Sequence, residues 1–208
     1  MSDYNDFGFE NANESHSHAY LLKPLIHLLG NSEDKTILDL GCGNGSLTRS
    51  LIGNGYNVYG TDASAKGIKL AQDLYPDRFA LQNLESDLLP IKLQGVKFTT
   101  VISTEVIEHL YHPRKLIRFA KDVLINNGGG DLIISTPYHG YLKNLTISLA
   151  GKWDTHMPPE WDGGHIKMWS KATLTALLES EGFTVTHFKG CGRLPLLWKS
   201  MMLKASIG

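Results

Sequence analysis

Short apolar runs alternate with segments of helical spacing along most of the chain. Five runs have the length of buried strands: "TILDLG" (36–41), "YNVYGTD" (56–62), "FALQN" (79–83), "FTTVIST" (98–104) and "DLIIST" (131–136). The segments 46–55, 64–75 and 113–129 between them space their apolar residues as helices do. This alternation predicts an α/β domain with a mostly parallel sheet covered by helices on both faces.

The C-terminal part departs from this alternation. Residues 170–183, "SKATLTALLESEGF", predict a helix that Ser170 caps and Gly182 ends. Two strand-like runs follow, "FTVTHFKG" and "LLWKSMMLKA", joined by "CGRLP". A short connection that contains glycine predicts an antiparallel hairpin at the end of the sheet.

Residues 137–169 have no clear periodicity and are rich in aromatic residues, histidine, glycine and proline. A connection this long is more often functional than a plain linker. We refer to it as the insertion, and we expect it to belong to a single domain that covers residues 1–208.

Composition excludes several classes of protein. The formal net charge is −1, with 20 basic against 21 acidic residues, so no basic surplus points to nucleic acid. Two cysteines give no disulfide framework, which favours a reducing, cytoplasmic location. We find neither a secretory signal nor an apolar run long enough to span a bilayer.

The strongest motif is "LDLGCGNGSL", which follows the first predicted strand. Asp39 is followed by Gly41, Gly43 and Gly45, and glycines at such a turn let the backbone approach a ligand closely. Asp62 ends the next strand, where a carboxylate can accept both hydroxyls of a ribose. The G-x-G-x-G spacing differs from the G-x-G-x-x-G of dinucleotide folds. A glycine turn alone would serve a dinucleotide, a nucleoside or only a turn.

Together these motifs resemble the class I S-adenosylmethionine-dependent methyltransferases over roughly residues 34–205. The resemblance implies a Rossmann-like seven-stranded sheet, mostly parallel, with an antiparallel C-terminal hairpin. It also implies that residues 1–33 form a helical cap over the cofactor and that the insertion covers the methyl acceptor. Asn83 and Leu84 stand where the family often has a Gly-Asp pair, so Asp87 is a rival contact for the adenine. The cofactor contacts that the resemblance implies are Asp39, Gly41, Cys42, Gly43, Gly45, Asp62, Ala63, Asn83, Leu84 and Thr104.

The stretch "TEVIEHL" (104–110) gathers Glu105, Glu108 and His109 just after the fourth strand. If a helix begins near Glu105, the three side chains share one face. Three interpretations are open at this point. The residues could be a solvated helix N-terminus, His109 could act as a general base, or the group could bind Mn, Fe, Co or Zn, and less well Mg.

The same stretch resembles the E-x-x-E-H segment of the ubiquinone-biosynthesis O-methyltransferases and of the small-RNA 3′-terminal 2′-O-methyltransferases. In the RNA enzymes both glutamates, the histidine and one downstream histidine bind a divalent metal. His165 in "GGHIKMWSKATL" stands at the matching place. The resemblance thus implies a metal site made of Glu105, Glu108, His109 and His165, with the first three also candidates for catalysis.

The function we expect is S-adenosylmethionine-dependent O-methylation of a small phenolic or quinone-like acceptor. The alternatives are a metal-dependent RNA 2′-O-methyltransferase and a cofactor-binding protein without turnover. The segment "LTISLAGKW" (145–153) has an apolar face, which is compatible with peripheral contact with a membrane.

Overall fold

The computed structural model describes residues 8–83 and 88–208, and the expected contacts Leu84 and Asp87 lie outside them. Seven strands form one sheet in the order β3-β2-β1-β4-β5-β7-β6. All neighbouring pairs are parallel except β5 with β7 and β7 with β6. The predicted fold, with its antiparallel C-terminal hairpin, is confirmed. The strands are β1 (Thr36–Leu40), β2 (Asn57–Asp62), β3 (Phe79–Leu81), β4 (Thr100–Thr104), β5 (Gly130–Pro137), β6 (Thr184–Cys191) and β7 (Ser200–Ile207).

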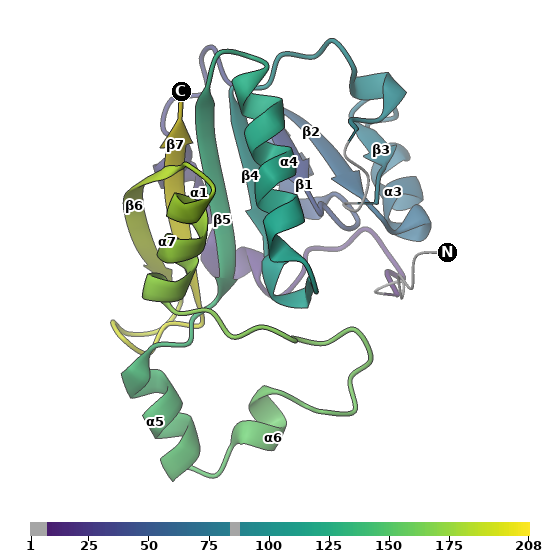
Figure 1. Ribbon diagram of the computed structural model, residues 1–208. Helices are drawn as coiled ribbons and strands as arrows, with labels where there is room; N and C mark the ends of the chain where they lie inside the picture. The colour runs from purple at the N-terminus through teal and green to yellow at the C-terminus, as the bar shows by residue number, and fades with distance from the viewer. Residues whose placement is uncertain (1–7, 84–87) are drawn as a thin grey trace.

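Helices cover both faces of the sheet. Figure 1 shows two of them in front of the sheet, α4 (Pro113–Ile125) and α7 (Lys171–Ser180). They enclose a core with the strand residues Leu38, Val101 and Leu132. The opposite face packs Ile37, Ile102 and Ile133 against two other helices, α1 (His18–Leu29) and α2 (Ser46–Gly53). Neighbouring residues of one strand therefore enter different cores, which is why these strands are apolar at nearly every position.

Smaller helices complete the structure. A third small core joins β3 to α3 (Ala65–Gln72) through Ile68, Ala71 and Phe79. Two short 3-10 turns lie before and after β4, η1 (Ile91–Leu93) and η2 (Ile107–His109). The insertion is not irregular throughout, since it contains α5 (Tyr141–Leu149) and α6 (Trp153–His156). None of the described helices is long and apolar enough to cross a membrane.

Local chemistry explains the ends of the two front helices. Pro113 stands at the start of α4, where its missing N–H costs no hydrogen bond. Ser170 caps α7 by accepting a hydrogen bond from the Thr173 backbone N–H at 3.2 Å. The Thr173 hydroxyl in turn accepts one from the Ser170 N–H at 3.0 Å, which closes a capping box.

The C-terminal hairpin has a longer connection than its sequence suggests. The second strand begins at Ser200, not at residue 196, so residues 192–199 connect the two strands. Arg193 and Leu196 adopt positive φ angles of 59° and 66°. The chain therefore bends in this connection, which lies at the same end of the sheet as the insertion (Figure 1).

Strand order fixes the place of the candidate site. β1 and β4 are neighbours at the centre of the sheet, and the chain leaves them toward opposite edges. Ligands of open α/β sheets bind beyond the carboxyl ends of the strands at such a switch point. The glycine turn follows β1 and "TEVIEHL" follows β4, so topology brings these two segments together.

Candidate active site at the carboxyl edge of the sheet

The glycine turn is packed so tightly that side chains would not fit. Gly41, Gly43 and Gly45 all have positive φ angles, 81°, 57° and 71°. A Cβ on Gly43 would lie 2.6 Å from the ring of Phe9, and one on Gly45 would lie 2.7 Å from the Phe79 ring. Both the backbone conformation and the close contacts therefore require glycine.

Asp62 braces this turn from the end of β2. Its Oδ2 accepts a hydrogen bond from the Gly43 N–H at 2.8 Å, and its Oδ1 accepts one from the Ser64 N–H at 2.7 Å. The carboxylate is half-buried. It is thus fixed beside the glycine turn, where the predicted ribose would lie.

The side chain of Asp39 is buried inside the protein. The side chain is 1% exposed, and Oδ2 accepts a hydrogen bond from the Thr48 hydroxyl at 2.7 Å. Its Oδ1 is buried without a hydrogen-bond partner among the described residues. Burial raises the pKa of Asp39 to about 7, against the effect of the Thr48 hydrogen bond. An unpaired buried oxygen at this place fits a ligand that brings a donor to the end of β1.

The other implied cofactor contacts lie around the same turn. Cys42 is buried, Ala63 follows β2, Asn83 follows β3 and Thr104 ends β4. The segment 9–13 crosses the turn, because the Asn44 amide donates hydrogen bonds to the backbone oxygens of Asn11 and Asn13, each at 2.9 Å. The glycine cradle, the braced Asp62 and the unpaired Asp39 oxygen fit S-adenosylmethionine.

Glu105 does not begin a helix, contrary to the same-face argument. It has a positive φ of 54°, and the only helical turn nearby is η2. Its Oε1 accepts a hydrogen bond from the Ser135 hydroxyl at 2.7 Å, and its Oε2 accepts one from the Ser200 hydroxyl at 3.0 Å. Glu105 is therefore tied to β5 and β7 by both of its oxygens.

Glu108 is 1% exposed, and only one of its two carboxylate oxygens accepts a hydrogen bond among the described residues. Its Oε2 accepts a hydrogen bond from the Thr136 hydroxyl at 3.0 Å, whereas Oε1 has no hydrogen-bond partner among the described residues. Burial, and next the charge of Glu105, raise the pKa of Glu108 well above its ordinary value. A carboxylate buried in this way requires either a proton or a nearby positive charge.

Two imidazole nitrogens face the unpaired Glu108 oxygen. Nε2 of His109 lies 4.0 Å from Glu108 Oε1, and Nε2 of His165 lies 3.9 Å from it. His109 Nδ1 is 2.8 Å from the Gly163 carbonyl oxygen, which can only accept, so Nδ1 is the donor. In the neutral ring, Nε2 then carries the lone pair. Burial, followed by the charge of His109, lowers the pKa of His165 to about 4, so this ring is neutral at pH 7.

These three residues form a Glu-His-His triad (Glu108, His109 and His165), whose ligand atoms all lie within 4.8 Å of one another. Glu105 is not part of this group. One carboxylate oxygen and two imidazole nitrogens are a common ligand set for Mn, Fe, Co or Zn. The backbone contacts of His109 would orient its ring for such an ion.

Backbone hydrogen bonds deliver His165 to this place. The N–H groups of Ile166 and Lys167 both donate to the Glu108 carbonyl oxygen, at 2.9 and 3.1 Å. The two ends of the insertion also meet, because the His139 N–H donates to the Trp169 carbonyl oxygen at 3.0 Å. The two ends of the insertion therefore lie together, and His165 lies beside the end of β4.

The structure adds residues that the sequence reasoning missed. Ser135, Thr136 and Ser200 hold the two glutamates, and Lys143 of α5 is buried with an exposed fraction of 4%. Tyr20 of α1 also reaches the site, since burial and then the charge of Glu105 raise its pKa. The spacing of apolar residues predicts strands and helices, but it does not predict which hydroxyl groups of different strands come close to one another. No local signal in the sequence could therefore have identified these residues.

Comparisons with known proteins identify the family. Residues 14–188 match the family model described as "Methyltransferase domain". The ubiquinone biosynthesis O-methyltransferase of Paraburkholderia phytofirmans is 25% identical over 183 residues, which are 86% of this chain and 75% of that protein. The mitochondrial enzyme of the same name from Arabidopsis thaliana is 33% identical over 99 residues, 46% of this chain, and the match spans only 31% of that protein.

Solved structures show the same fold. One is magnesium protoporphyrin IX methyltransferase of Synechocystis PCC 6803 with bound S-adenosylhomocysteine. It superimposes with a TM-score of 0.65 at 22% sequence identity, and the match covers 90% of this chain and 82% of that chain. A SAM-dependent methyltransferase from Aquifex aeolicus has a TM-score of 0.66 and 18% identity, over 93% and 94% of the two chains. With the family match and the glycine turn, these findings show that the chain belongs to the class I S-adenosylmethionine-dependent methyltransferases.

Proposed function

We propose that this methyltransferase transfers the methyl group to a hydroxyl of a small phenolic or quinone-like acceptor and that a divalent cation assists it. The observation that carries the proposal is the unpaired, buried Oε1 of Glu108, which faces the Nε2 atoms of His109 and His165. The ubiquinone O-methyltransferases, to which the chain is distantly similar, support an oxygen acceptor.

The residues of the chain have separate tasks in this reaction. S-adenosylmethionine supplies an electrophilic methyl group, and a divalent cation lowers the pKa of a hydroxyl bound to it. Asp39, the glycine turn and Asp62 would hold the cofactor, and the triad would hold the cation close to the acceptor hydroxyl. Orientation of the two reactants is the main contribution that a protein can make to such a transfer.

Glu105 supports the triad without belonging to it. Because both of its oxygens accept hydrogen bonds from serine hydroxyls, its negative charge is held beside Glu108. Burial, and next the charge of Glu105, raise the pKa of Glu108, and a divalent cation held by the triad would offset the repulsion between the two carboxylates. The insertion covers one side of His109, since the rings of His165 and Trp161 lie against it with centroids 4.9 and 5.8 Å away.

Labelled S-adenosylmethionine tests this function. The full chain should transfer its methyl group to a catechol in the presence of Mn²⁺, and EDTA should stop the transfer. A parallel reaction with a short RNA tests the alternative of 2′-O-methylation. Transfer to RNA but not to catechols would overturn the proposed acceptor, and full turnover in EDTA would overturn the role of the metal.

A further inference from the structure

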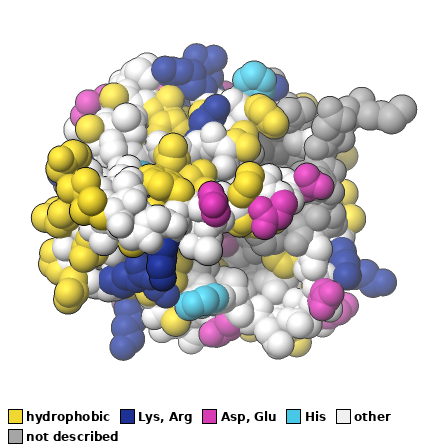
Figure 2. All heavy atoms as spheres, turned by 90° about the horizontal axis from the view of Figure 1, so that it is seen from below, with side chains coloured by type: hydrophobic (Ala, Val, Ile, Leu, Met, Phe, Trp, Pro, Cys, Tyr) yellow, Lys and Arg dark blue, Asp and Glu magenta, His cyan; other side chains and the backbone are white. Residues whose placement is uncertain are grey.

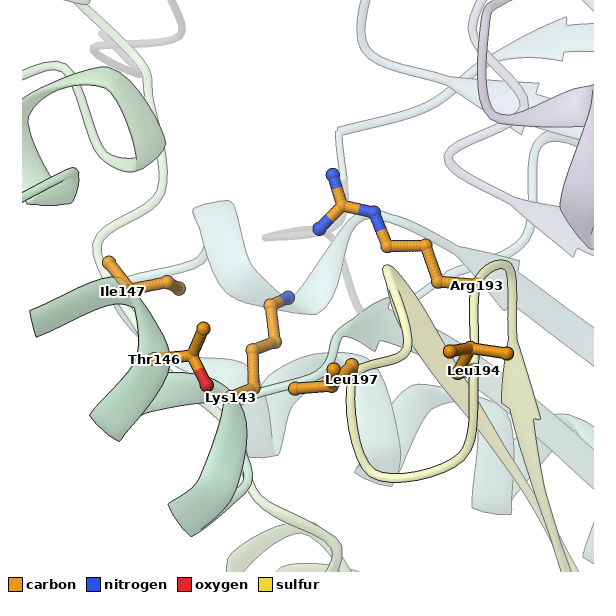
Figure 3. Close-up of a pocket in the computed structure, with 6 residues that line it drawn as sticks. All are labelled: Lys143, Thr146, Ile147, Arg193, Leu194 and Leu197. Carbon is orange, nitrogen blue, oxygen red and sulfur yellow. The ribbon is translucent and has the colours of Figure 1, made fainter. Parts of the chain in front are cut away.

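A pocket of about 350 Å³ opens between α5 and the connection between β6 and β7. It is lined by Lys143, Thr146, Ile147, Arg193, Leu194 and Leu197. Figure 3 shows that the Lys143 and Arg193 side chains come from opposite sides, α5 and the connection, and that their nitrogen atoms lie on the same side of the pocket. Its volume suits a small organic group.

The two cations of this pocket have no ion-pair partner in the part of the chain that the structure describes. Among residues 8–83 and 88–208, no carboxylate forms an ion pair with Lys143 or Arg193. The Lys143 ammonium donates one hydrogen bond within this part of the chain, to the Lys199 carbonyl oxygen at 3.2 Å. An ammonium carries three donors, so a buried one with a single neutral acceptor can take further acceptors.

The burial of Lys143 makes this arrangement unusual. Lysine is almost never fully buried without a partner, yet Lys143 is only 4% exposed. Burial, and next the charge of Arg193, lower its pKa to about 8, and the charge of Glu105 only partly offsets this. Two positive charges at one pocket, neither in an ion pair among the described residues, fit an anionic ligand.

One residue of the pocket, Lys143, also neighbours residues of the proposed active site. Lys143 contacts the backbone of Lys199, and the hydroxyl of the next residue, Ser200, donates to Glu105. The charge of Lys143 also contributes to lowering the pKa values of His139 and His165. Lys143 therefore lines the pocket and also acts on a histidine of the triad.

We propose that Lys143 and Arg193 bind a carboxylate carried by the methyl acceptor, while Ile147, Leu194 and Leu197 contact the apolar part of that molecule. The acceptor would thus be an amphipathic acid, held at one end by the two cations and presenting its hydroxyl to the triad at the other. This inference rests on the proposed function for the hydroxyl, whereas the anion site itself stands on the pocket.

A binding experiment tests the anion site without any reaction. The full chain is saturated with S-adenosylhomocysteine in EDTA at pH 7 and titrated calorimetrically with 4-phenylbutyrate and with its neutral amide. We expect the acid to bind at least about tenfold more tightly, since hydrogen bonds to a charged group contribute at least this factor. Equal binding of acid and amide, or binding of neither, would overturn the proposal.

Three variants locate the effect. Lys143→Met and Arg193→Met should each lower the affinity for the acid about tenfold and leave the affinity for the amide within about twofold. Lys152→Met removes an exposed lysine of the same insertion and should change neither. Because Arg193 is exposed, its replacement does not threaten folding. A preference for the acid that survives in both pocket variants would place its binding site elsewhere and overturn the proposal.

Turnover connects the anion site to the acceptor. In the wild type, kcat/KM for 3-(3,4-dihydroxyphenyl)propanoate should exceed kcat/KM for its amide by more than about tenfold. In Lys143→Met the ratio of the two values should fall toward one. 4-Phenylbutyrate should compete with the catechol acid. Preferential binding of 4-phenylbutyrate without any methyl transfer would uphold the anion site and overturn the proposed reaction. Methyl transfer without preference for the acid would uphold the proposed reaction and overturn the anion site.

Discussion

Nε2 of His165 lies 3.9 Å from the buried Oε1 of Glu108. One residue belongs to the insertion and the other follows β4, and backbone hydrogen bonds from Ile166 and Lys167 to the Glu108 carbonyl oxygen hold them together. The same backbone contact therefore closes the insertion and completes the triad.

Replacement of Glu108 by glutamine should weaken Mn²⁺ binding by at least about tenfold, because the amide keeps the shape of the side chain but loses its charge. Titration of the metal-free protein with Mn²⁺ checks this. Glu160→Gln, at an exposed position of the insertion, is the matched control and should bind as the wild type does. Unchanged affinity in Glu108→Gln would rule out this glutamate as a ligand.

Gly43→Ala should destabilise the protein by about 1 kcal/mol or more, because its φ of 57° disfavours a side chain and the new Cβ would meet the Phe9 ring. Thermal unfolding measures this loss. The double variant Phe9→Ala/Gly43→Ala should recover part of it, since only the steric contact is relieved. If the second change recovers nothing, the contact between Phe9 and the glycine turn contributes nothing to the cost.

Asp62→Asn should lower the affinity for S-adenosylhomocysteine by roughly 10- to 100-fold, since hydrogen bonds to a charged group contribute about 1.5–3 kcal/mol. Calorimetric titration of the ligand gives the change directly. Asp73→Asn, an exposed aspartate just after α3, should leave the affinity unchanged. Equal affinity in Asp62→Asn and wild type would remove Asp62 from the cofactor site.

Lys143→Met should stabilise the free protein at pH 7, by the order of 1 kcal/mol, because wild type buries a charge there. The pKa of Lys143 is lowered to about 8 in the folded state, from 10.5. Between these pH values the unfolded chain binds more protons at this residue, so wild-type stability rises with pH and the advantage of the variant shrinks.

Urea unfolding at pH 7 and pH 9.5 checks this trend. Lys152→Met again serves as the control, because an exposed lysine should show no such dependence. A Lys143→Met variant that is less stable than wild type at pH 7 would mean that the lysine is already compensated within the folded chain, and it would speak against an anion site.

The sequence predicted most elements of the sheet because burial on both faces leaves a strong apolar signal in strands such as Ile37–Leu40 and Val101–Ile102. It failed on the start of β7, where the apolar residues Leu196 and Leu197 belong to the connection. An apolar run does not distinguish a strand from a loop that packs against a neighbouring helix. The helix expected at Glu105 does not form, since the Glu105 N–H donates to the Ser135 carbonyl oxygen at 3.2 Å and its φ is 54°.

The sequence by itself determined the family and the residue types at the end of each strand, because glycine turns and strand ends are local features of the chain. Only the tertiary structure decided which of those residues meet. It brought His165 to Glu108 and His109, tied Glu105 to two serines, and placed Lys143 beside Arg193. These contacts join residues far apart in the chain, and they form because strand order and backbone pairing position the segments that carry them.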